Sequence, residues 1–225
     1  MTSNHQLTLT SDGSHTLYVP EIDEHYHSVN GAVQESRHIF IDAGLHECKK
    51  NEINVFEVGF GTGLNAFLVM LEAERLQKKI YFTTVELYPV DLQNIKKLNY
   101  PDQISVGKTE DFRKLHSAEW NKKIEISPYF YLKKICGDFT KLTLESNFDV
   151  VFFDAFSPEK QAEMWTGNIF ATIYEKCNEN AVLTTYCAKG AVRRAMQKAG
   201  FTVERIPGPP GKREILRSRK IIINC

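Results

Sequence analysis

Paired cysteines are missing from this sequence, and so is any obvious set of metal ligands. The five cysteines are scattered, and no two form a CxxC pair. This pattern argues against a zinc site or a disulfide framework and favours a reducing compartment. Three histidines, His25, His27 and His38, lie close together, but no cysteine or carboxylate pair completes a ligand set at helical spacing. We therefore expect no metal cofactor.

Long apolar runs are absent as well. No run approaches the ~20 residues that a membrane span requires. The first residues lack the basic region and apolar core of a secretory signal. With 225 residues and 42% hydrophobic residues, the chain is long enough to bury a full core. These features predict a cytoplasmic protein that is not embedded in a membrane.

Basic residues are unevenly distributed along the chain. The first 36 residues contain no Lys or Arg, whereas the last 40 are rich in both, although the net charge is zero. A local basic face can bind a polyanion even on a neutral protein. A solvated helix and hairpin is the alternative interpretation of this segment. The candidates for contact with a nucleic acid are Arg193, Arg194, Lys212 and Arg213.

The stretch Glu57–Asn65 is the most informative feature that is present. It joins an apolar run at 53–56 to a helix-like run at 66–71, so a strand is expected to pass through a glycine turn into a helix. Such a turn brings backbone N–H groups close to a ligand. The GxGxG spacing differs from the dinucleotide pattern GxGxxG and suits S-adenosylmethionine, which has no phosphates. A tight turn without a ligand is the alternative. The candidate cofactor-binding residues here are Glu57, Gly59, Gly61, Thr62, Gly63, Leu64 and Asn65.

Two further strand ends carry acidic residues suited to an adenosine. Glu86 follows the apolar run 80–85, about 20 residues past the glycine turn, where a carboxylate can accept from both ribose hydroxyls. Asp138 follows the strand expected at 129–136, and Phe139 comes directly after it. The glycine turn resembles motif I of the class I methyltransferases, in which such an aspartate commonly accepts from the adenine amino group, with the aromatic ring against the base. An N-cap for a short helix is an equally physical account of Asp138.

The candidate catalytic residues follow the most apolar strand. Residues 148–153 form a near-continuous apolar run, typical of a strand buried on both faces of a parallel sheet. Ligands of such sheets bind beyond the carboxyl ends of the strands, where Asp154 stands. Its carboxylate can accept N–H bonds from an amine and direct the lone pair. Phe156 and Pro158 offer an apolar wall for a base. The alternative is an aspartate that caps the next helix.

The alternation of expected strands and helices predicts an α/β fold. We expect a class I S-adenosylmethionine-dependent methyltransferase sandwich, which is Rossmann-like. Its seven-stranded, mostly parallel sheet would end in a reversed C-terminal hairpin. Strands are expected at 53–56, 80–85, 129–136, 148–153, 181–187, 201–205 and 214–222. Helices are expected at 62–78, 89–98, 160–177 and 191–199.

The chain is expected to have two parts. Residues 1–45 would form an N-terminal extension, with a β-hairpin and then a helix, packed on a methyltransferase domain at 46–225. Residues 99–127 are longer than an ordinary connection of an α/β unit. We interpret them as an insertion that shapes the substrate side.

Several motifs occur together and point to one family. They are NGAVQESRHIF (30–40), GFGTGLN (59–65), FFDAFSPEKQAEMWT (152–166), VRRAMQKAGF (192–201) and GKREIL (211–216). In this combination the chain resembles the methyltransferase domain of the bacterial tRNA 5-methylaminomethyl-2-thiouridine biosynthesis enzyme. The resemblance spans about residues 25 to 217, and the block 152–166 is its most specific part.

The resemblance implies a tRNA substrate and S-adenosylmethionine as methyl donor. The expected reaction is N-methylation of the primary amine of 5-aminomethyl-(2-thio)uridine at the wobble position. It also implies that Asp138 contacts the adenine and that Asp154 meets the amine. Trp165, in the same specific block, becomes a candidate for substrate contact. By the same resemblance, Gly59, Gly61, Gly63 and Glu86 would hold the cofactor.

The chain departs from the bifunctional members of that family in two ways. Those members continue into a flavin-dependent oxidase domain, whereas this chain ends at Cys225. We therefore expect the stand-alone form, which needs no FAD and receives its aminomethyl substrate ready-made. The family often has Gly after the catalytic Asp and Ala before the Pro, whereas this chain has Ala155 and Ser157 there, and both changes are conservative. No obligate protein partner is evident.

Two other functions remain open at this point. An aminopropyltransferase also uses a strand-end aspartate to orient an amine. A polyamine site, however, contains several acidic residues around the substrate, whereas the block after Asp154 is mainly aromatic and neutral. A non-catalytic tRNA-binding protein on the same fold is disfavoured because the glycine turn, Glu86 and Asp154 are all present. Which tRNAs bind, and whether the 2-thio group matters, is not encoded in these motifs.

Overall fold

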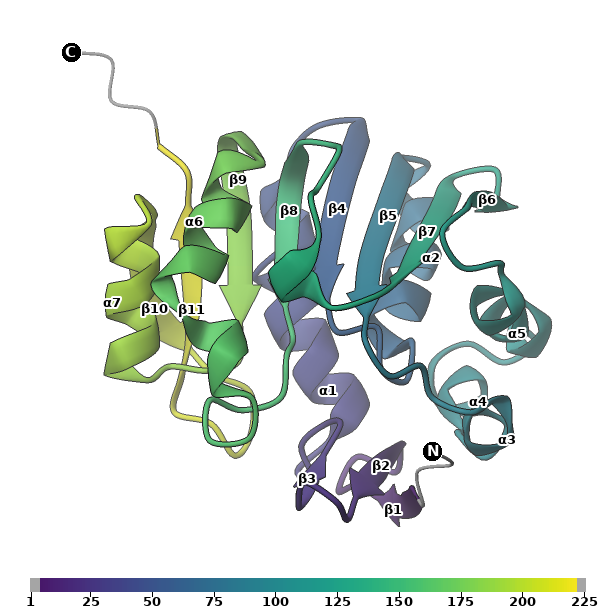
Figure 1. Cartoon of the computed structure of the whole chain (residues 1–225). Coiled ribbons are helices and arrows are strands. Elements are labelled where there is room, and N and C mark those ends of the chain that lie inside the picture. The colour runs from purple at the N-terminus through teal and green to yellow at the C-terminus, as the bar shows by residue number, and fades with distance from the viewer. Residues whose placement is uncertain (1–4, 222–225) are drawn as a thin grey trace.

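The central strand of the molecule is β4 (Glu52–Val58), which lies within a mixed eight-stranded sheet (Figure 1). The computed structural model describes residues 5–221. In spatial order the strands are β10 (Thr202–Pro207), β11 (Glu214–Arg219), β9 (Cys177–Thr185), β8 (Phe148–Phe153), β4, β5 (Lys79–Glu86), β7 (Phe130–Cys136) and β6 (Lys123–Ser127). The pairs β9–β11, β10–β11 and β6–β7 are antiparallel, and the others are parallel. The class I methyltransferase sandwich with its reversed C-terminal hairpin is confirmed.

Helices cover both faces of this sheet (Figure 1). The α-helices are α1 (Ala32–Ser36), α2 (Leu64–Leu76), α3 (Leu92–Ile95), α4 (Tyr100–Ile104), α5 (Thr109–Ser117), α6 (Gly167–Glu175) and α7 (Gly190–Lys198). Shorter turns are a π-helix at Arg37–Asp42 and 3-10 helices at Leu45–Glu47, Phe139–Lys141 and Ala162–Trp165. None of the helices formed by residues 5–221 combines the length and apolar character needed to cross a bilayer.

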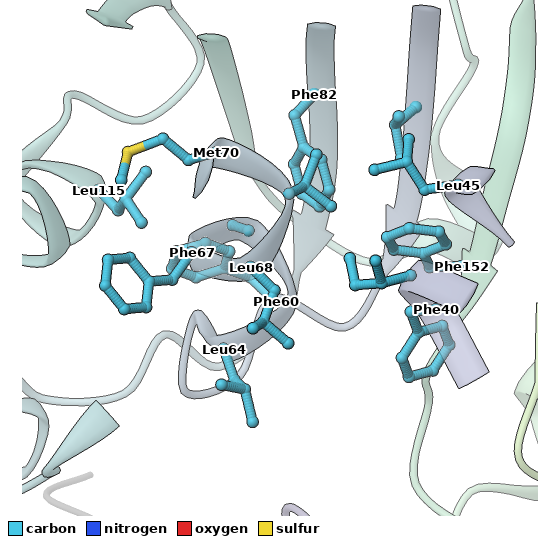
Figure 2. Close-up of a cluster of buried hydrophobic side chains, with 14 of the residues drawn as sticks. Phe40, Leu45, Phe60, Leu64, Phe67, Leu68, Met70, Phe82, Leu115 and Phe152 are labelled. Atoms are coloured by element: carbon cyan, nitrogen blue, oxygen red, sulfur yellow. The ribbon is translucent and has the colours of Figure 1, made fainter. Parts of the chain in front are cut away.

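Two hydrophobic cores form because successive side chains of β8 point to opposite faces of the sheet. Phe152 packs against Phe40 with ring centroids 5.1 Å apart, in the core that also contains α2 (Figure 2). Phe153 packs against Phe170 of α6, with centroids 5.0 Å apart, in the core on the other face. All six residues of β8 are buried, as the apolar run predicted.

The N-terminal extension forms a small sheet of its own. Its strands β1 (Gln6–Leu9), β2 (His15–Val19) and β3 (Glu24–His25) pair antiparallel, and α1 with the π-helix follows. The expected hairpin and helix are confirmed. Figure 1 shows this small sheet beyond the carboxyl ends of β4 and β5. The expected ranges 1–45, 46–225 and 214–222 each include residues outside those described.

The segment expected to be an insertion, 99–127, adds an eighth strand to the seven expected. Its last part is β6, which pairs antiparallel with β7 and so occupies the edge that β7 otherwise leaves open. Ile126 of β6 is buried in the core. Earlier in the segment, Phe112 of α5 contacts Phe67 of α2 with ring centroids 5.2 Å apart. The segment therefore packs on the sheet and on α2.

The prediction of one long helix at 160–177 is wrong. A 3-10 helix covers Ala162–Trp165, and α6 begins only at Gly167. Thr166 separates them because it adopts the extended conformation of an N-cap, with its Oγ1 accepting from the N–H of Ile169. The helix expected at 89–98 likewise shortens to α3.

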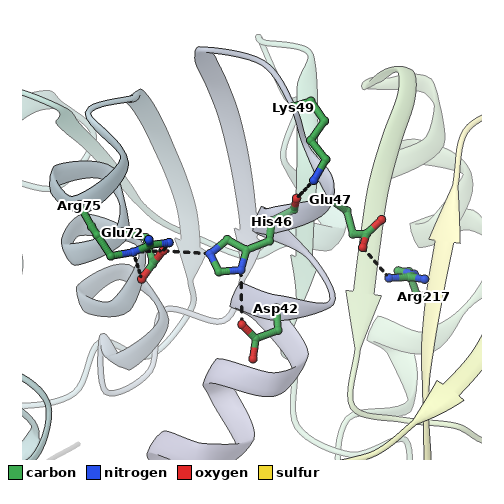
Figure 3. A network of polar contacts seen from close by, with 7 residues as sticks. All are labelled: Asp42, His46, Glu47, Lys49, Glu72, Arg75 and Arg217. Atoms are coloured by element: carbon green, nitrogen blue, oxygen red, sulfur yellow. Dashed lines mark hydrogen bonds and ion pairs between the residues drawn. The ribbon is translucent and has the colours of Figure 1, made fainter.

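Polar contacts connect the residues before β4 to α2 and to the C-terminal hairpin (Figure 3). His46 Nε2 lies 2.9 Å from Glu72 Oε2 on α2. Glu47 Oε1 lies 3.1 Å from Arg217 Nη1 on β11, and the other oxygen of Glu47 pairs with Arg219. Arg217 and Arg219 of the basic C-terminal segment therefore form ion pairs within the fold.

Candidate active site

A cavity of about 1250 Å³ opens at the carboxyl ends of β4, β5 and β8. This place follows from the topology, because the chain runs from β4 to β5 on one side and β8 lies on the other. Loops diverge at such a reversal of strand order and leave a crevice for a ligand. The N-terminal extension closes the crevice, because residues of β3 and α1 line it too.

The glycine turn follows β4 and forms the floor of this cavity. Gly59 has φ 91°, and a Cβ at this position would lie 2.5 Å from the carbonyl oxygen of Asp154. Gly61 has φ 48°, and a Cβ there would lie 2.8 Å from the ring of Tyr26. Both positions therefore need glycine for conformation and for space. Thr62, Leu64 and Asn65 line the cavity as well, whereas Gly63 serves as the N-cap of α2 outside the lining formed by the described residues.

Glu86 closes β5 at the cavity wall. Its Oε2 accepts from the N–H of Gly61 at 3.0 Å, and its Oε1 accepts from the N–H of Tyr88 at 2.9 Å. Burial raises the pKa of this carboxyl, and the backbone donors oppose that rise. Each carboxylate oxygen has a further lone pair, so the group can still accept from a diol.

Asp138 and Phe139 lie at the end of β7 and line the same cavity. Asp138 Oδ1 accepts from the N–H of Thr140 at 3.0 Å and from its hydroxyl at 2.6 Å. These bonds make Asp138 the N-cap of the 3-10 helix and lower its pKa to about 2. The capping account is therefore confirmed, and contact with an adenine stays a prediction. Phe139 packs against Phe56, with ring centroids 5.3 Å apart.

Asp154 ends β8 and faces the same cavity from the opposite wall. Its Oδ2 accepts from the side-chain amide of Asn65 at 2.9 Å. Burial, and next the negative charge of Glu35, raise the pKa of Asp154 to about 7, while Asn65 and Lys212 oppose the rise. Asp154 caps no helix here, because the next two helices begin after Gln161 and Thr166. The capping alternative is therefore wrong.

The residues after Asp154 divide between the cavity and its support. Phe156 lines the cavity, with its ring centroid 5.1 Å from that of Tyr26. Trp165, expected to contact substrate, is instead buried, and its indole N–H donates to the carbonyl oxygen of Phe156 at 2.7 Å. Pro158 does not line the cavity formed by the described residues. Trp165 therefore holds the aromatic wall from behind.

Glu57 also lies beneath the cavity rather than in its wall. The side chain is buried, and its Oε2 accepts from the hydroxyl of Thr84 at 2.7 Å. Burial raises its pKa well above the usual range. Direct contact of Glu57 with a ligand is not supported by this position.

Sequence patterns did not identify the cavity residues supplied by the N-terminal extension. Glu24 accepts from the hydroxyl of Ser157 at 2.9 Å, and Glu35 accepts from the N–H of Ser28 at 2.9 Å. His27 is hydrogen-bonded to Thr62 at 2.7 Å. The only available signal was the segment 30–40, which contains Glu35 but gives no spacing rule for it.

Two features of the surroundings bear on metals and RNA. Within residues 5–221 no group of three His, Cys, Asp or Glu side chains is arranged to hold a metal ion. Burial lowers the pKa of His27 to about 4, so its imidazole is neutral.

Lys212 lines the cavity, whereas Arg193, Arg194 and Arg213 lie outside the lining formed by the described residues. Arg194 and Arg213 are exposed, and Arg193 is half-buried.

Comparison with known proteins assigns the class. Residues 107–221 match the family of S-adenosyl-L-methionine-dependent methyltransferases, and the chain belongs to this family. The geometry fits this cofactor as well: the glycine floor leaves no room for a Cβ, and the buried Asn65 Oδ1 lacks a hydrogen-bond partner among the described residues. We expect Glu86 and Asp138 to contact its adenosine.

The chain is similar to named relatives over most of its length. It is 29% identical over 228 residues to the tRNA 5-methylaminomethyl-2-thiouridine biosynthesis bifunctional protein MnmC of Cupriavidus metallidurans, covering 94% of this chain and 33% of that protein. For the same-named protein of Pseudomonas fluorescens the identity is 30% over 213 residues, covering 87% and 32%. The chain thus spans about a third of the length of these curated relatives.

Solved structures show the same fold. MnmC2 from Aquifex aeolicus matches with a TM-score of 0.74 at 24% identity, covering 99% of this chain and 73% of that one. Spermidine synthase from Thermotoga maritima matches with a TM-score of 0.58 at 14% identity, covering 99% and 75%.

The raised pKa of Asp154 predicts a pH-dependent stability difference. The folded state holds a proton on Asp154 up to about pH 7, whereas an unfolded aspartate releases it near pH 4. Ionisation of Asp154 therefore destabilises the fold fully above pH 7 and not at all below about pH 4. Asp154→Asn should raise the melting temperature at pH 8 much more than at pH 4.5. Asp138→Asn is the control of opposite sign, because the pKa of Asp138 is lowered. Equal shifts of Asp154→Asn at both pH values would contradict the assignment.

Glu86 is predicted to bind the ribose of S-adenosylmethionine. A hydrogen bond to a charged acceptor contributes about 1.5–3 kcal/mol, so loss of the carboxylate should raise the dissociation constant roughly 100-fold. Isothermal titration calorimetry of Glu86→Ala measures this change. Glu52→Ala, at the amino end of β4 and far from the cavity lining, is the control and should bind as the wild type does. A change below threefold for Glu86→Ala would argue against the ribose role.

Proposed function

We propose that this protein methylates the primary amine of 5-aminomethyl-(2-thio)uridine at the wobble position of tRNA. The product is 5-methylaminomethyl-(2-thio)uridine, and S-adenosylmethionine is the methyl donor. The observation that carries the proposal is Asp154: a half-buried acceptor follows β8 in the same cavity as the glycine turn and Glu86. The similarity to tRNA-modifying relatives supports the tRNA substrate, and a tRNA substrate implies a cytoplasmic location.

The side chains of the cavity suit an amine nucleophile. S-adenosylmethionine supplies an electrophilic methyl group when bound. An amine must present its lone pair to that carbon, and Asp154 can accept an N–H bond and so orient the lone pair. Asn65 fixes the carboxylate of Asp154 through its amide at 2.9 Å. Asp154 is therefore assigned to hold the amine in line with the methyl group.

An aromatic wall lies next to Asp154 and suits a pyrimidine. Phe156 and Tyr26 line the cavity with ring centroids 5.1 Å apart. A nucleobase gains about 1–3 kcal/mol by stacking on an aromatic side chain. Trp165 supports the wall through its bond to the carbonyl of Phe156. We propose that the ring of Phe156 stacks on the uracil ring of the substrate. Pro158 belongs to the loop that carries Phe156.

The basic helix α7 and the loop before β11 are the elements that we propose bind the phosphate backbone of the tRNA. Arg193 and Arg194 lie on α7, and Arg213 is exposed on the loop. Several other cations of this segment are engaged in ion pairs, such as Arg205 with Glu214. Lys212 faces the cavity, so its role differs from phosphate binding.

Aminopropyl transfer is the second candidate function. Glu24, Glu35 and Asp154 line one cavity, which is more acidic than the sequence block suggested. Polyamine substrates require such acids. However, the positive charge of Lys212 offsets that of Glu35, and Glu24 already accepts from Ser157. Decarboxylated S-adenosylmethionine with putrescine as acceptor separates the two activities by the mass of the product.

The methylation proposal predicts transfer to one synthetic substrate. The protein should move a labelled methyl group from S-adenosylmethionine to an anticodon stem-loop bearing 5-aminomethyl-2-thiouridine, and none to the same stem-loop with uridine. Asp154→Ala should keep the cofactor dissociation constant within a few-fold and lose at least about 100-fold in turnover. No incorporation by the wild type would overturn the function. Equal losses of binding and turnover in Asp154→Ala would indicate a structural residue.

The assignment of α7 to tRNA predicts a change in salt dependence. Each phosphate contact contributes about one to the slope of log affinity against log salt. Arg193→Ala/Arg194→Ala should therefore lower the slope by about two, as measured by filter binding between 50 and 300 mM salt, roughly the useful range. Arg113→Ala removes an exposed cation of α5 as the matched control. An unchanged slope in the double variant would place the tRNA elsewhere.

A further inference from the structure

Glu35 stands in the cavity beside Asp154, although it comes from α1 of the N-terminal extension. Only 12% of its side chain is exposed. Its Oε2 accepts from the N–H of Ser28 at 2.9 Å, which fixes the carboxylate. Its Oε1 is buried and lacks a hydrogen-bond partner among the described residues. Both carboxyl groups line this cavity, and the negative charge of Glu35 contributes to the raised pKa of Asp154.

Lys212 supplies a positive charge at the same place. Its Nζ lies 3.1 Å from Glu35 Oε1, without the geometry of a hydrogen bond, and 5.2 Å from the ring centroid of Tyr186. The loop that carries Lys212 packs against the turn before α1, because a Cβ at Gly211 would lie 2.1 Å from the amide of Asn30. An alkylammonium group therefore already sits between the loop and Glu35.

Three other polar groups line the cavity around Glu35, and each makes at least one hydrogen bond. Glu24 on β3 accepts from the N–H and the hydroxyl of Ser157. Tyr186, after β9, donates to the carbonyl of Ala155 at 2.8 Å, and burial raises its pKa. Asp154 on β8 accepts from Asn65. Among the charged groups that face this part of the cavity, Glu35 alone presents a buried carboxylate oxygen without a hydrogen bond within residues 5–221.

We propose that Glu35 is the second carboxylate of the amine site, which binds the substrate's ammonium where Lys212 Nζ now lies and accepts its proton. This inference rests on the proposed function, because a primary amine arrives as an ammonium ion at neutral pH. The evidence for the position is the ammonium of Lys212, which has the same chemistry as the expected substrate group. Displacement of Lys212 by the substrate leaves the total charge of the pocket unchanged.

The proton and electron balance of the step is simple. One proton passes from R–CH₂–NH₃⁺ to the Glu35 carboxylate, leaving R–CH₂–NH₂ and a neutral carboxylic acid. The nitrogen lone pair then forms the N–CH₃ bond while the S–CH₃ bond breaks and leaves its electron pair on sulfur. The product is a secondary ammonium ion. Asp154 accepts one N–H bond throughout and keeps the lone pair aimed at the methyl carbon.

The pH profile of Glu35→Gln tests this assignment. Glutamine keeps the size of the side chain and can still accept from Ser28, but it cannot take a proton. With the aminomethyl stem-loop as substrate, kcat/KM should fall at least about 100-fold at pH 7, with the dissociation constant of S-adenosylmethionine unchanged within twofold. The difference in kcat/KM between the variant and the wild type should shrink by up to about tenfold per pH unit toward pH 9.5. The reason is that a growing fraction of the free substrate then has a neutral amine and needs no proton acceptor on the protein. Glu35→Asp should be slower but keep the wild-type pH profile.

The matched control is Glu24→Gln, a carboxylate of the same cavity that is held by Ser157. Its effect on kcat/KM should be the same at every pH. A Glu35→Gln deficit that is constant with pH, or an activity equal to the wild type, would overturn the role of Glu35 while leaving the proposed function intact. Failure of the wild type itself to methylate the stem-loop would overturn the proposed function and this inference together. Melting temperatures of both variants separate misfolding from lost chemistry.

Discussion

The site depends on the close approach of the glycine turn to the end of β8. The N–H of Asp154 donates to the carbonyl of Val58 at 3.0 Å, which continues the pairing of β8 with β4 to the last residue. At Gly59 the two chains come so close that a Cβ would lie 2.5 Å from the carbonyl oxygen of Asp154. This contact sets the cofactor-binding turn and the candidate catalytic carboxylate in one cavity, and other features of the site are arranged around it.

Charge is distributed in the cavity so that each carboxyl group has a different environment. Asp138 is held ionised by its hydrogen bonds, whereas burial raises the pKa of Glu86 and Asp154. Glu35 is fixed by one backbone donor and lies beside Lys212. Differences of this kind fit the roles proposed for these groups, which are to bind a ribose, to orient an amine and to accept a proton.

The N-terminal extension is part of the active-site architecture as well as a cover for the fold. Tyr26 packs over Gly61, and His27 is hydrogen-bonded to Thr62. The extension therefore contacts the glycine turn at two neighbouring residues. Glu35 reaches the cavity from α1. The methyltransferase sheet alone would hold the cofactor side of the site, while the extension adds much of the wall on the substrate side.

Local patterns in the chain were sufficient to place Gly59, Glu86 and Asp154 at one cavity, because the carboxyl ends of parallel strands meet at the same edge of a sheet. The burial of β8 followed from its near-continuous apolar run, which is typical of a strand covered on both faces. Neither the pairing of Glu35 with Lys212 nor the burial of Trp165 could be predicted in this way. The first depends on how the loop before β11 packs against the extension, and the second on how Trp165 packs against Phe153 and Tyr186. Such contacts between distant segments leave no periodic signal. The packed fold therefore decides the substrate side of the site.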